Sequence, residues 1–238
     1  MGATSAIQWT DATWNPWYGC QKVSAGCKFC YMYRDMKRYG RDPNIVQRAK
    51  PATFNAPLKW KEPQLIFTCS WSDFFIQDAD AWRAEARAII RDTPRHTYQI
   101  LTKRIELVQE SWFENVWLGV SVENRAALGR IDVLRTKSAG LRFLSIEPLL
   151  EDLGKLNLLG IDWVILGGES GALSQARRFD IEWARAIVAQ CKSAGVPCFV
   201  KQLGTRPQQE GAYVKLADHK GGNSEEWPAD LRVREFPR

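Results

Sequence analysis

Short apolar segments recur along the chain, and most neighbouring segments are separated by a helical pattern. Most of the apolar segments do not alternate apolar and polar residues, as expected for strands that are buried on both faces. Helical patterns span Ala79–Arg91, Arg125–Ser138 and Ile181–Ala194. Alternating strands and helices predict parallel strands joined by right-handed crossovers. The strand-like segments are Leu65–Cys69, Thr97–Leu101, Val116–Val120, Leu141–Ile146, Trp163–Leu166 and Cys198–Val200.

The predicted fold class is therefore α/β, a partial (βα)6-type TIM-like barrel of parallel strands in a single domain. A seventh strand is expected around Ile7–Trp9. A doubly wound open sheet has the same alternation, and periodicity does not separate the two architectures. We assign residues 1–204 to the barrel. Residues 205–238 are assigned to a C-terminal appendage, because the sequence becomes polar and rich in turn residues there.

Three cysteines near the N-terminus are the strongest chemical signal. Cys20, Cys27 and Cys30 have the spacing Cys-x6-Cys-x2-Cys. Three thiolates can hold three irons of a four-iron cluster and leave the fourth iron open. Thiolates also suit zinc, and His219 is then a candidate fourth ligand, although only one close-set ligand pair is present. Six cysteines in 238 residues do not make a disulfide-dense chain, so a metal site in a reducing cytoplasm is the better interpretation.

Charge and hydropathy limit the partners of the chain. No apolar run approaches the length of a membrane span, and residues 1–9 lack the features of a secretory signal, so we expect a cytoplasmic protein without a membrane partner. The net charge is +6, and residues 34–61 contain eight basic and two acidic residues. This basic stretch is typical of proteins that bind DNA or RNA, and also of an ordinary solvated surface.

Polar side chains follow each predicted strand, and in a βα barrel such positions lie together at the C-terminal mouth. Any one of them is also typical of a helix N-cap. As a set, the carboxylates and the lysine need compensation by a ligand or by each other. A bound α-amino acid moiety supplies that compensation, since its ammonium prefers carboxylates and its carboxylate prefers a cation. The candidates are Ser70, Asp73, Ser121, Glu123, Glu147, Glu169, Lys201 and Gln202.

Several blocks of the sequence resemble one family. Residues 9–16 (WTDATWNP), 26–31 (GCKFCY), 116–123 (VWLGVSVE), 145–150 (SIEPLL), 167–171 (GGESG) and 200–204 (VKQLG) resemble the phage Gp37/Gp68-like three-cysteine family. That family is similar to radical S-adenosylmethionine enzymes. The cysteine loop here is three residues longer than the usual Cys-x3-Cys-x2-Cys, and the Gly-Gly-Glu falls late in the chain.

The resemblance implies a [4Fe–4S] cluster on Cys20, Cys27 and Cys30, with S-adenosylmethionine on the open iron. It implies a 5′-deoxyadenosyl radical that modifies substrate, as an isomerase acting on a glycyl-type thymidine in phage DNA. An electron donor such as a flavodoxin or ferredoxin is then required, and the location is the host cytoplasm if the gene is phage-borne. The expected cofactor-binding residues are Phe29, Ser70, Asp73, Ser121 and Glu123, and the expected catalytic residues are Glu147, Glu169, Lys201 and Gln202.

Two alternatives stay open on the sequence. Within the enzyme class, the substrate can instead be tRNA or a peptide. Outside it, the chain can be a zinc- or cluster-stabilised nucleic-acid-binding protein without catalysis. The polar residues at the strand ends argue against that second interpretation, because a structural metal does not need carboxylates around a barrel mouth.

Overall fold

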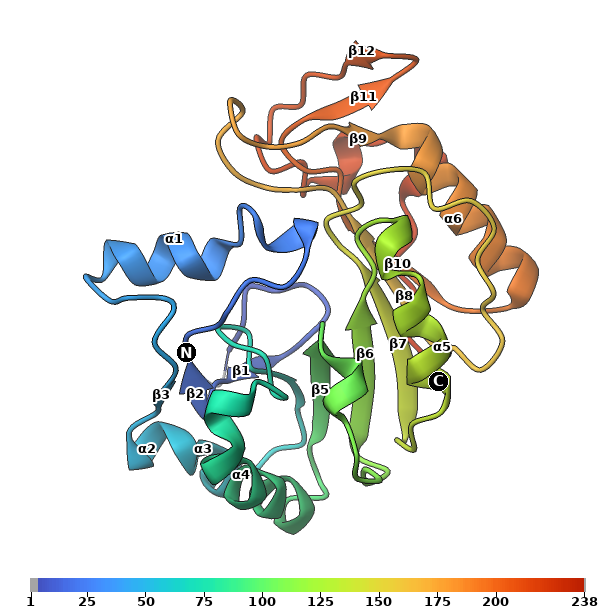
Figure 1. Cartoon of the computed structure of the whole chain (residues 1–238). Coiled ribbons are helices and arrows are strands. Elements are labelled where there is room, and N and C mark those ends of the chain that lie inside the picture. Colours follow the sequence, from blue (N-terminus) through green and yellow to red (C-terminus); the bar gives the residue numbers. More distant parts are fainter. Residues whose placement is uncertain (1–3, 238) are drawn as a thin grey trace. The chain divides into compact units, whose positions relative to one another are not determined.

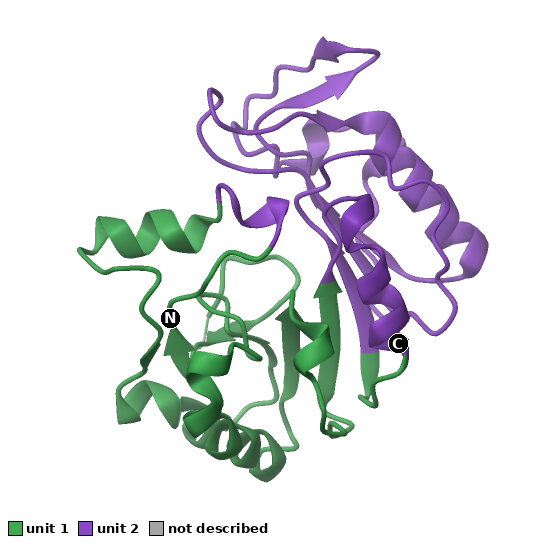
Figure 2. Ribbon diagram, viewed as in Figure 1, with its two compact units in different colours: residues 1–23, 30–120, 136–141 green, residues 24–29, 121–135, 142–238 purple. Residues whose placement is uncertain are grey.

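The computed structural model of the chain describes residues 4–237. Contacts divide the chain into two compact units (Figure 2). Unit 1 comprises residues 1–23, 30–120 and 136–141, and unit 2 comprises residues 24–29, 121–135 and 142–238. The cysteine loop is shared between the units, because residues 24–29 belong to unit 2 and the residues on either side belong to unit 1.

The principal sheet is parallel, with strand order β1-β4-β5-β6-β7-β8-β10. Within this sheet, each strand lies beside the strands that precede and follow it along the chain, as in a barrel wound in one direction (Figure 1). This confirms the α/β class with the parallel strands of a partial TIM-like barrel. The seven strands are β1 (Ala12–Trp14), β4 (Leu65–Thr68), β5 (Thr97–Thr102), β6 (Val116–Ser121), β7 (Leu141–Ile146), β8 (Trp163–Gly167) and β10 (Cys198–Gln202).

Short strands form two small additional sheets. In unit 1, β2 (Trp17–Tyr18) pairs antiparallel with β3 (Gln47–Arg48). In unit 2, β11 (Pro207–Gln209) lies between β9 (Phe179–Asp180) and β12 (Ala212–Tyr213).

The first strand of the principal sheet was expected at residues 7–9 and that prediction is wrong. Residues 7–9 lie in a turn in which the Thr10 N–H donates to the Ile7 carbonyl over 3.3 Å. The Thr10 hydroxyl donates to the Leu65 carbonyl (2.9 Å) and accepts from the Phe67 N–H (3.0 Å), which fixes the chain beside β4. The strand therefore begins at Ala12, after the turn.

The helices of unit 1 are amphipathic or short. α1 (Tyr31–Arg38) buries Met32 and Met36, four residues apart, and leaves its charged residues in solvent. α4 (Asp80–Asp92) was expected one residue earlier, at 79–91, and buries Ala86, Ile89 and Ile90. The remaining helices are α2 (Pro51–Phe54) and α3 (Ala56–Lys59).

In unit 2, α6 (Ile181–Ala194) has the predicted bounds. The Asp180 carboxylate accepts from the Glu182 N–H over 3.0 Å as an N-cap, and Gly195 ends the helix with a φ of 67°. The helix expected over 125–138 is shorter than predicted, with a 3-10 turn at Arg125–Ala127 followed by α5 (Gly129–Arg135). Gly129 at the junction has low helix propensity, which accounts for the break.

Residues 205–238 lie within unit 2. Their last segment covers the outer edge of β10: the Val200 N–H donates to the Val233 carbonyl (2.8 Å), and the Glu235 N–H donates to the Cys198 carbonyl (2.9 Å). An uncovered strand edge invites pairing with another chain, and this segment prevents it. Across residues 4–237, no helix has both the length and the apolar character needed to cross a membrane.

Candidate functional site

None of the three loop cysteines is in a disulfide bond. Cys20 and Cys30, in unit 1, are partly exposed, and Cys27, in unit 2, is 8% exposed. Cys30 also occupies the N-cap position of α1. Within residues 4–237, no three His, Cys, Asp or Glu side chains are gathered closely enough to hold a metal ion. The three cysteines therefore remain candidate ligands on the strength of their sequence spacing and of the groups around each sulfur.

In unit 1, a buried ion pair lies against Cys20. Arg104 Nη1 is 3.1 Å from Asp73 Oδ2 and 3.8 Å from Cys20 Sγ, and Arg104 Nη2 donates to the Gln21 carbonyl over 2.8 Å. Burial alone lowers the pKa of the Arg104 guanidinium, but Asp73 and Cys20 outweigh burial, so the pKa is raised and the side chain stays charged. Arg104 thus presents a fixed positive charge to the first cysteine of the loop.

Asp73, expected to bind the cofactor, has both carboxylate oxygens occupied within unit 1. Oδ1 accepts from the Phe75 N–H (3.0 Å) and the Thr102 hydroxyl (2.7 Å). Oδ2 accepts from the Lys103 N–H (3.0 Å) in addition to Arg104. The geometry gives Asp73 the role of an anchor between the β4 and β5 loops.

Ser70 lies in the loop that follows β4. Its hydroxyl accepts from Asn15 Nδ2 over 2.9 Å, and its carbonyl accepts from the Tyr31 hydroxyl over 2.6 Å. The preceding Cys69 has a φ of 61°, in the left-handed region that non-glycine residues rarely occupy. Such strain concentrates at functional sites. Burial raises the pKa of the Cys69 thiol well above its ordinary value, as expected for a buried cysteine of low reactivity.

In unit 2, Glu123 is fully buried and contacts the cysteine loop. Its Oε1 accepts from the Ser24 hydroxyl over 2.5 Å, and its Oε2 is 2.9 Å from Arg130 Nη1. The Ser24 hydroxyl also lies 3.6 Å from Cys27 Sγ. A Cβ on Gly26 would lie 2.4 Å from Glu123 Oε1, so a larger residue there would have to displace the buried Glu123 side chain. Glu123 therefore shapes the segment that carries Cys27.

Ser121 and Phe29, the other two residues expected to bind the cofactor in unit 2, are held by arginine or lysine side chains. Ser121 is the last residue of β6 and is 3% exposed, and its carbonyl accepts from Arg130 Nη1 over 2.7 Å. Phe29 is partly exposed, with Lys28 Nζ 5.1 Å and Arg177 Cζ 5.5 Å from its ring centroid. These distances are in the range of cation–π contacts.

Glu169 forms a bidentate ion pair with Arg177. Glu169 Oε1 lies 2.5 Å from Arg177 Nη2, and Oε2 lies 2.9 Å from Arg177 Nε. Arg177 Nη1 donates to the Ala25 carbonyl of the cysteine loop over 2.8 Å. A carboxylate held by a fork of this kind is poorly suited to move protons. The geometry favours a role for Glu169 in holding Arg177 against the loop.

Glu147, Lys201 and Gln202 lie together in unit 2, as predicted for side chains at the ends of parallel strands. Lys201 Nζ is 2.6 Å from Glu147 Oε1, and Gln202 Nε2 is 3.3 Å from the same oxygen. Glu147 and Lys201 are 18% and 24% exposed, so both side chains reach solvent. A carboxylate and an ammonium in contact at a partly exposed site can bind a polar substrate and transfer a proton.

The Gly167-Gly168 pair beside these residues serves close packing of the backbone. A Cβ on Gly168 would lie 2.2 Å from the Leu203 carbonyl oxygen. The Gly168 N–H donates to the Gln202 carbonyl (2.9 Å), and Gln202 Nε2 donates to the Gly168 carbonyl (2.9 Å). The glycines therefore let two loops of unit 2 approach each other and orient the Gln202 amide.

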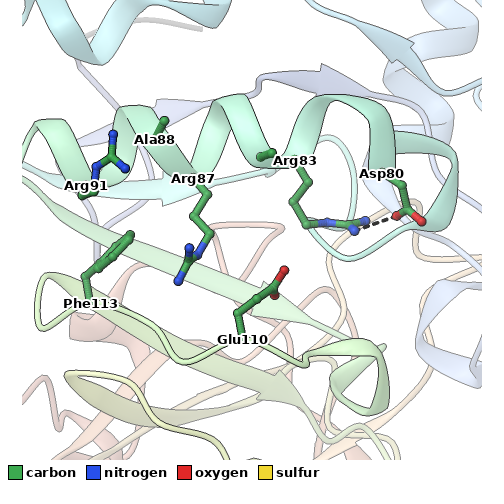
Figure 3. Close-up of a pocket in the computed structure, with 8 residues that line it drawn as sticks. Asp80, Arg83, Arg87, Ala88, Arg91, Glu110 and Phe113 are labelled. Carbon is green, nitrogen blue, oxygen red and sulfur yellow. Dashed lines mark ion pairs between the residues drawn. The ribbon is translucent and has the colours of Figure 1, made fainter.

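A cavity of about 240 Å3 in unit 1 lies between α4 and the segment before β6 (Figure 3). Its basic residues are already engaged: Arg83 pairs with Asp80 (2.6 Å), Arg87 Nη2 donates to the Ser111 carbonyl (2.8 Å), and Arg91 pairs with Asp92 (2.8 Å). None of the predicted site residues lines it, so it does not belong to the candidate site. The lining residues are Asp80, Arg83, Ala84, Arg87, Ala88, Arg91, Glu110 and Phe113.

Sequence reasoning missed the three arginines that contact the predicted residues, namely Arg104, Arg130 and Arg177. Arg104 follows β5 in a polar strand end, Thr102-Lys103-Arg104, and that position was a usable signal. Arg130 lies in a helical pattern and Arg177 in an irregular segment, and nothing in the sequence distinguishes them from surface arginines.

The fold and these side chains define an α/β protein of parallel strands with ionisable residues at the carboxyl ends of its strands. The chain belongs to the family described as "Protein of unknown function (DUF5131)", whose profile matches residues 4–228. No curated protein and no solved structure matches the chain.

Proposed function

We propose that the protein is a radical S-adenosylmethionine enzyme with a [4Fe–4S] cluster on Cys20, Cys27 and Cys30. The observation that carries the proposal is the set of three cysteines within eleven residues, none of them in a disulfide bond, of which Cys20 faces a hydrogen-bond donor. Arg104 Nη1 lies 3.8 Å from Cys20 Sγ, whereas the Ser24 hydroxyl, 3.6 Å from Cys27 Sγ, donates its proton to Glu123 Oε1. Donors to thiolate ligands stabilise the charge of a cluster and adjust its potential.

The chemistry of this donor set fits the cluster. Soft thiolates are the ligands of iron–sulfur clusters, and three of them leave one iron without a protein ligand. When bound, the cluster and S-adenosylmethionine supply a radical that abstracts hydrogen from the substrate. The protein supplies position, orientation and exclusion of water.

The residues of the chain then divide by role. The proposed cofactor-binding residues are Ser70 and Asp73 in unit 1 and Phe29, Ser121 and Glu123 in unit 2. Asp73 and Glu123 would act through the ion pairs that fix their own loops. Glu147, Lys201 and Gln202 would bind the substrate and transfer protons at Glu147 Oε1 and Lys201 Nζ. Glu169 belongs to the same predicted set but would act by holding Arg177.

The proposed substrate is an amino-acid-decorated thymidine in phage DNA, and the proposed reaction is an isomerisation. The support on the chain is its basic stretch, which suits a polyanion. An external electron donor such as a flavodoxin or ferredoxin is part of the proposal, as is a reducing cytoplasm that keeps the loop thiols free.

The test is anaerobic analysis of iron and sulfide, followed by incubation with S-adenosylmethionine and a strong reductant. About four irons per chain and formation of 5′-deoxyadenosine are expected. Cys27→Ala should lose the cluster and the product, whereas Cys198→Ala, which removes a buried thiol outside the loop, should keep both. Full iron loading in Cys27→Ala is incompatible with the proposal.

The second candidate function is a metal-stabilised nucleic-acid-binding protein without catalysis. The observation that favours it is the exposed basic face of α1, directly after Cys30. Colour separates the two functions: a brown anaerobic preparation supports the enzyme, and a colourless zinc protein that leaves S-adenosylmethionine intact supports the binding protein.

A further inference from the structure

We propose that unit 1 carries a docking surface for unpaired nucleic acid, formed by Arg34, Lys37, Arg38, Tyr39, Arg41 and Trp71. We refer to it as the Tyr39–Trp71 surface. The inference deepens the proposed function, since it names the surface that binds the substrate and states that the substrate is single-stranded. It rests on the proposed function in one respect, that the substrate is a nucleic acid.

The helix α1 exposes a charged face. Met32 and Met36 are buried, whereas Arg34, Lys37 and Arg38 are exposed. Residues 31–41 contain four basic residues and one acidic residue, Asp35, which lies 3.2 Å from Arg34. A net positive face of this kind binds phosphates and releases counterions.

An exposed aromatic residue, Tyr39, lies between the basic residues Arg38 and Arg41 in the chain. Tyr39 is 67% exposed, which is the highest exposure of an aromatic side chain among residues 4–237. Its ring centroid lies 6.2 Å from that of Trp71, with 34° between the ring planes. Exposed rings flanked by cations are the platform on which single-stranded nucleic acids stack their bases.

The platform is held rigidly on one side. The Trp71 N–H donates to Asn15 Oδ1 over 2.7 Å, and the Trp71 carbonyl accepts from the Gly19 N–H over 3.0 Å. Asn15 is itself fully buried. A ring whose backbone is fixed before binding loses little conformational entropy when a base stacks on it.

The aromatic rings favour a single-stranded partner over a duplex. In a duplex the base faces are covered by their neighbours, so a tyrosine ring finds no face to stack on, whereas an unpaired strand exposes every face. An acidic protein such as an electron donor offers carboxylates to the cations but has no particular use for the rings. The combination of cations and rings therefore favours unpaired nucleic acid.

The experiment measures anisotropy of a labelled oligothymidylate of about 12 nucleotides with the full chain, prepared anaerobically. Stacking is worth about 1–3 kcal/mol per base, so Tyr39→Ala should raise the Kd roughly 5- to 150-fold, and Tyr39→Phe should bind like the wild type. Tyr213→Ala is the matched control, because Tyr213 is an exposed tyrosine (48%) on β12 of unit 2. It should leave the Kd unchanged.

Charge is tested separately. Replacing Lys37 and Arg38 together by Gln should reduce the slope of log K against log salt by about 0.7 per residue on single strands. The double substitution of the exposed residues Lys192 and Lys220 by Gln changes the net charge equally and should leave the slope unaltered.

Three results would overturn the inference. The first is an equal Kd for the oligonucleotide in Tyr39→Ala and Tyr213→Ala. The second is an equal affinity of the wild type for the single strand and for a duplex of the same length. The third is a Tyr39→Ala variant that binds the oligonucleotide normally but is reduced more slowly by an acidic flavodoxin. Formation of 5′-deoxyadenosine without DNA is measured alongside. That reaction does not use the Tyr39–Trp71 surface. If the wild type forms no 5′-deoxyadenosine, the proposed function is contradicted. If Tyr39→Ala still forms it but no longer binds the oligonucleotide, the binding defect is independent of the radical chemistry.

Discussion

The carboxylate of Asp73 and the guanidinium of Arg104 are 3.1 Å apart, and these side chains are only 6% and 9% exposed. Burying two charges costs several kcal/mol per ion, and their attraction roughly offsets that cost when the remaining hydrogen bonds are made. Here they are made, since Asp73 accepts from three further donors. The ion pair therefore contributes mainly by fixing the position of Arg104, whose Nη1 lies 3.8 Å from the sulfur of Cys20.

Asp73→Ala should strongly destabilise the protein. Removing one partner of a buried pair leaves the other charge unpaired, and the expected loss is about 3–5 kcal/mol in the free energy of unfolding by urea. Asp92→Ala removes a surface pair whose partners are 62% and 53% exposed, and its expected loss is about 0–1 kcal/mol. Similar losses in the two variants would contradict the structural role given to Asp73.

Gly26→Ala should disturb the cysteine loop. The new Cβ meets Glu123 Oε1 at 2.4 Å, and overpacking of this kind costs about 1–3 kcal/mol. We expect lower thermal stability and lower iron occupancy after reconstitution. Gly129→Ala is the control in the same unit, because a Cβ there meets nothing within 4 Å. It should be neutral or stabilising by up to about 1 kcal/mol, and equal iron loss in both variants would refute the role of Gly26.

Lys201→Met should separate substrate chemistry from cofactor chemistry. The ammonium is lost from Glu147 Oε1, and removal of a general acid or base slows turnover about 100- to 10,000-fold. Iron content should stay at the wild-type level, since the Lys201 ammonium pairs with Glu147 Oε1. Lys192→Met, at an exposed position of α6, should retain turnover. A parallel loss of iron in Lys201→Met would argue for a structural role.

Tyr98 makes stability depend on alkaline pH. Its side chain is fully buried beside the Thr93 hydroxyl at 2.5 Å, and burial raises the pKa of Tyr98 from 10.0 to about 12. A raised pKa means that the folded state keeps its proton longer than the unfolded state. The stabilisation is therefore complete below pH 10 and is lost as the pH rises to about 12, by roughly 2–3 kcal/mol.

The measurement is urea unfolding of the wild type and Tyr98→Phe between pH 9 and 12. The phenylalanine variant cannot ionise, so its free energy of unfolding should fall less steeply over that interval. Parallel curves for the two proteins would show that Tyr98 does not carry the effect.

Much of the strand and helix layout was predictable, because it depends on local pattern. Continuous apolar runs such as Leu65–Thr68 and Trp163–Gly167 are strands that are largely or wholly buried, and burial demands apolar residues on both faces. α6 was predicted with its correct ends because Gly195 takes a left-handed conformation there. The first strand was misplaced, because the Thr10 hydroxyl forms a turn through contacts to Leu65 and Phe67, more than fifty residues away.

What the sequence determined by itself is the α/β class, most strand positions and the close spacing of three cysteines along the chain, since each follows from the order and burial of residues. Tertiary structure alone decided which ionisable groups are paired. In the folded chain Glu147 pairs with Lys201, Glu169 pairs with Arg177, and Arg104 contacts both Asp73 and Cys20. Long side chains can reach many partners, and only the folded loops determine which opposite charge lies within a few ångströms once water is excluded.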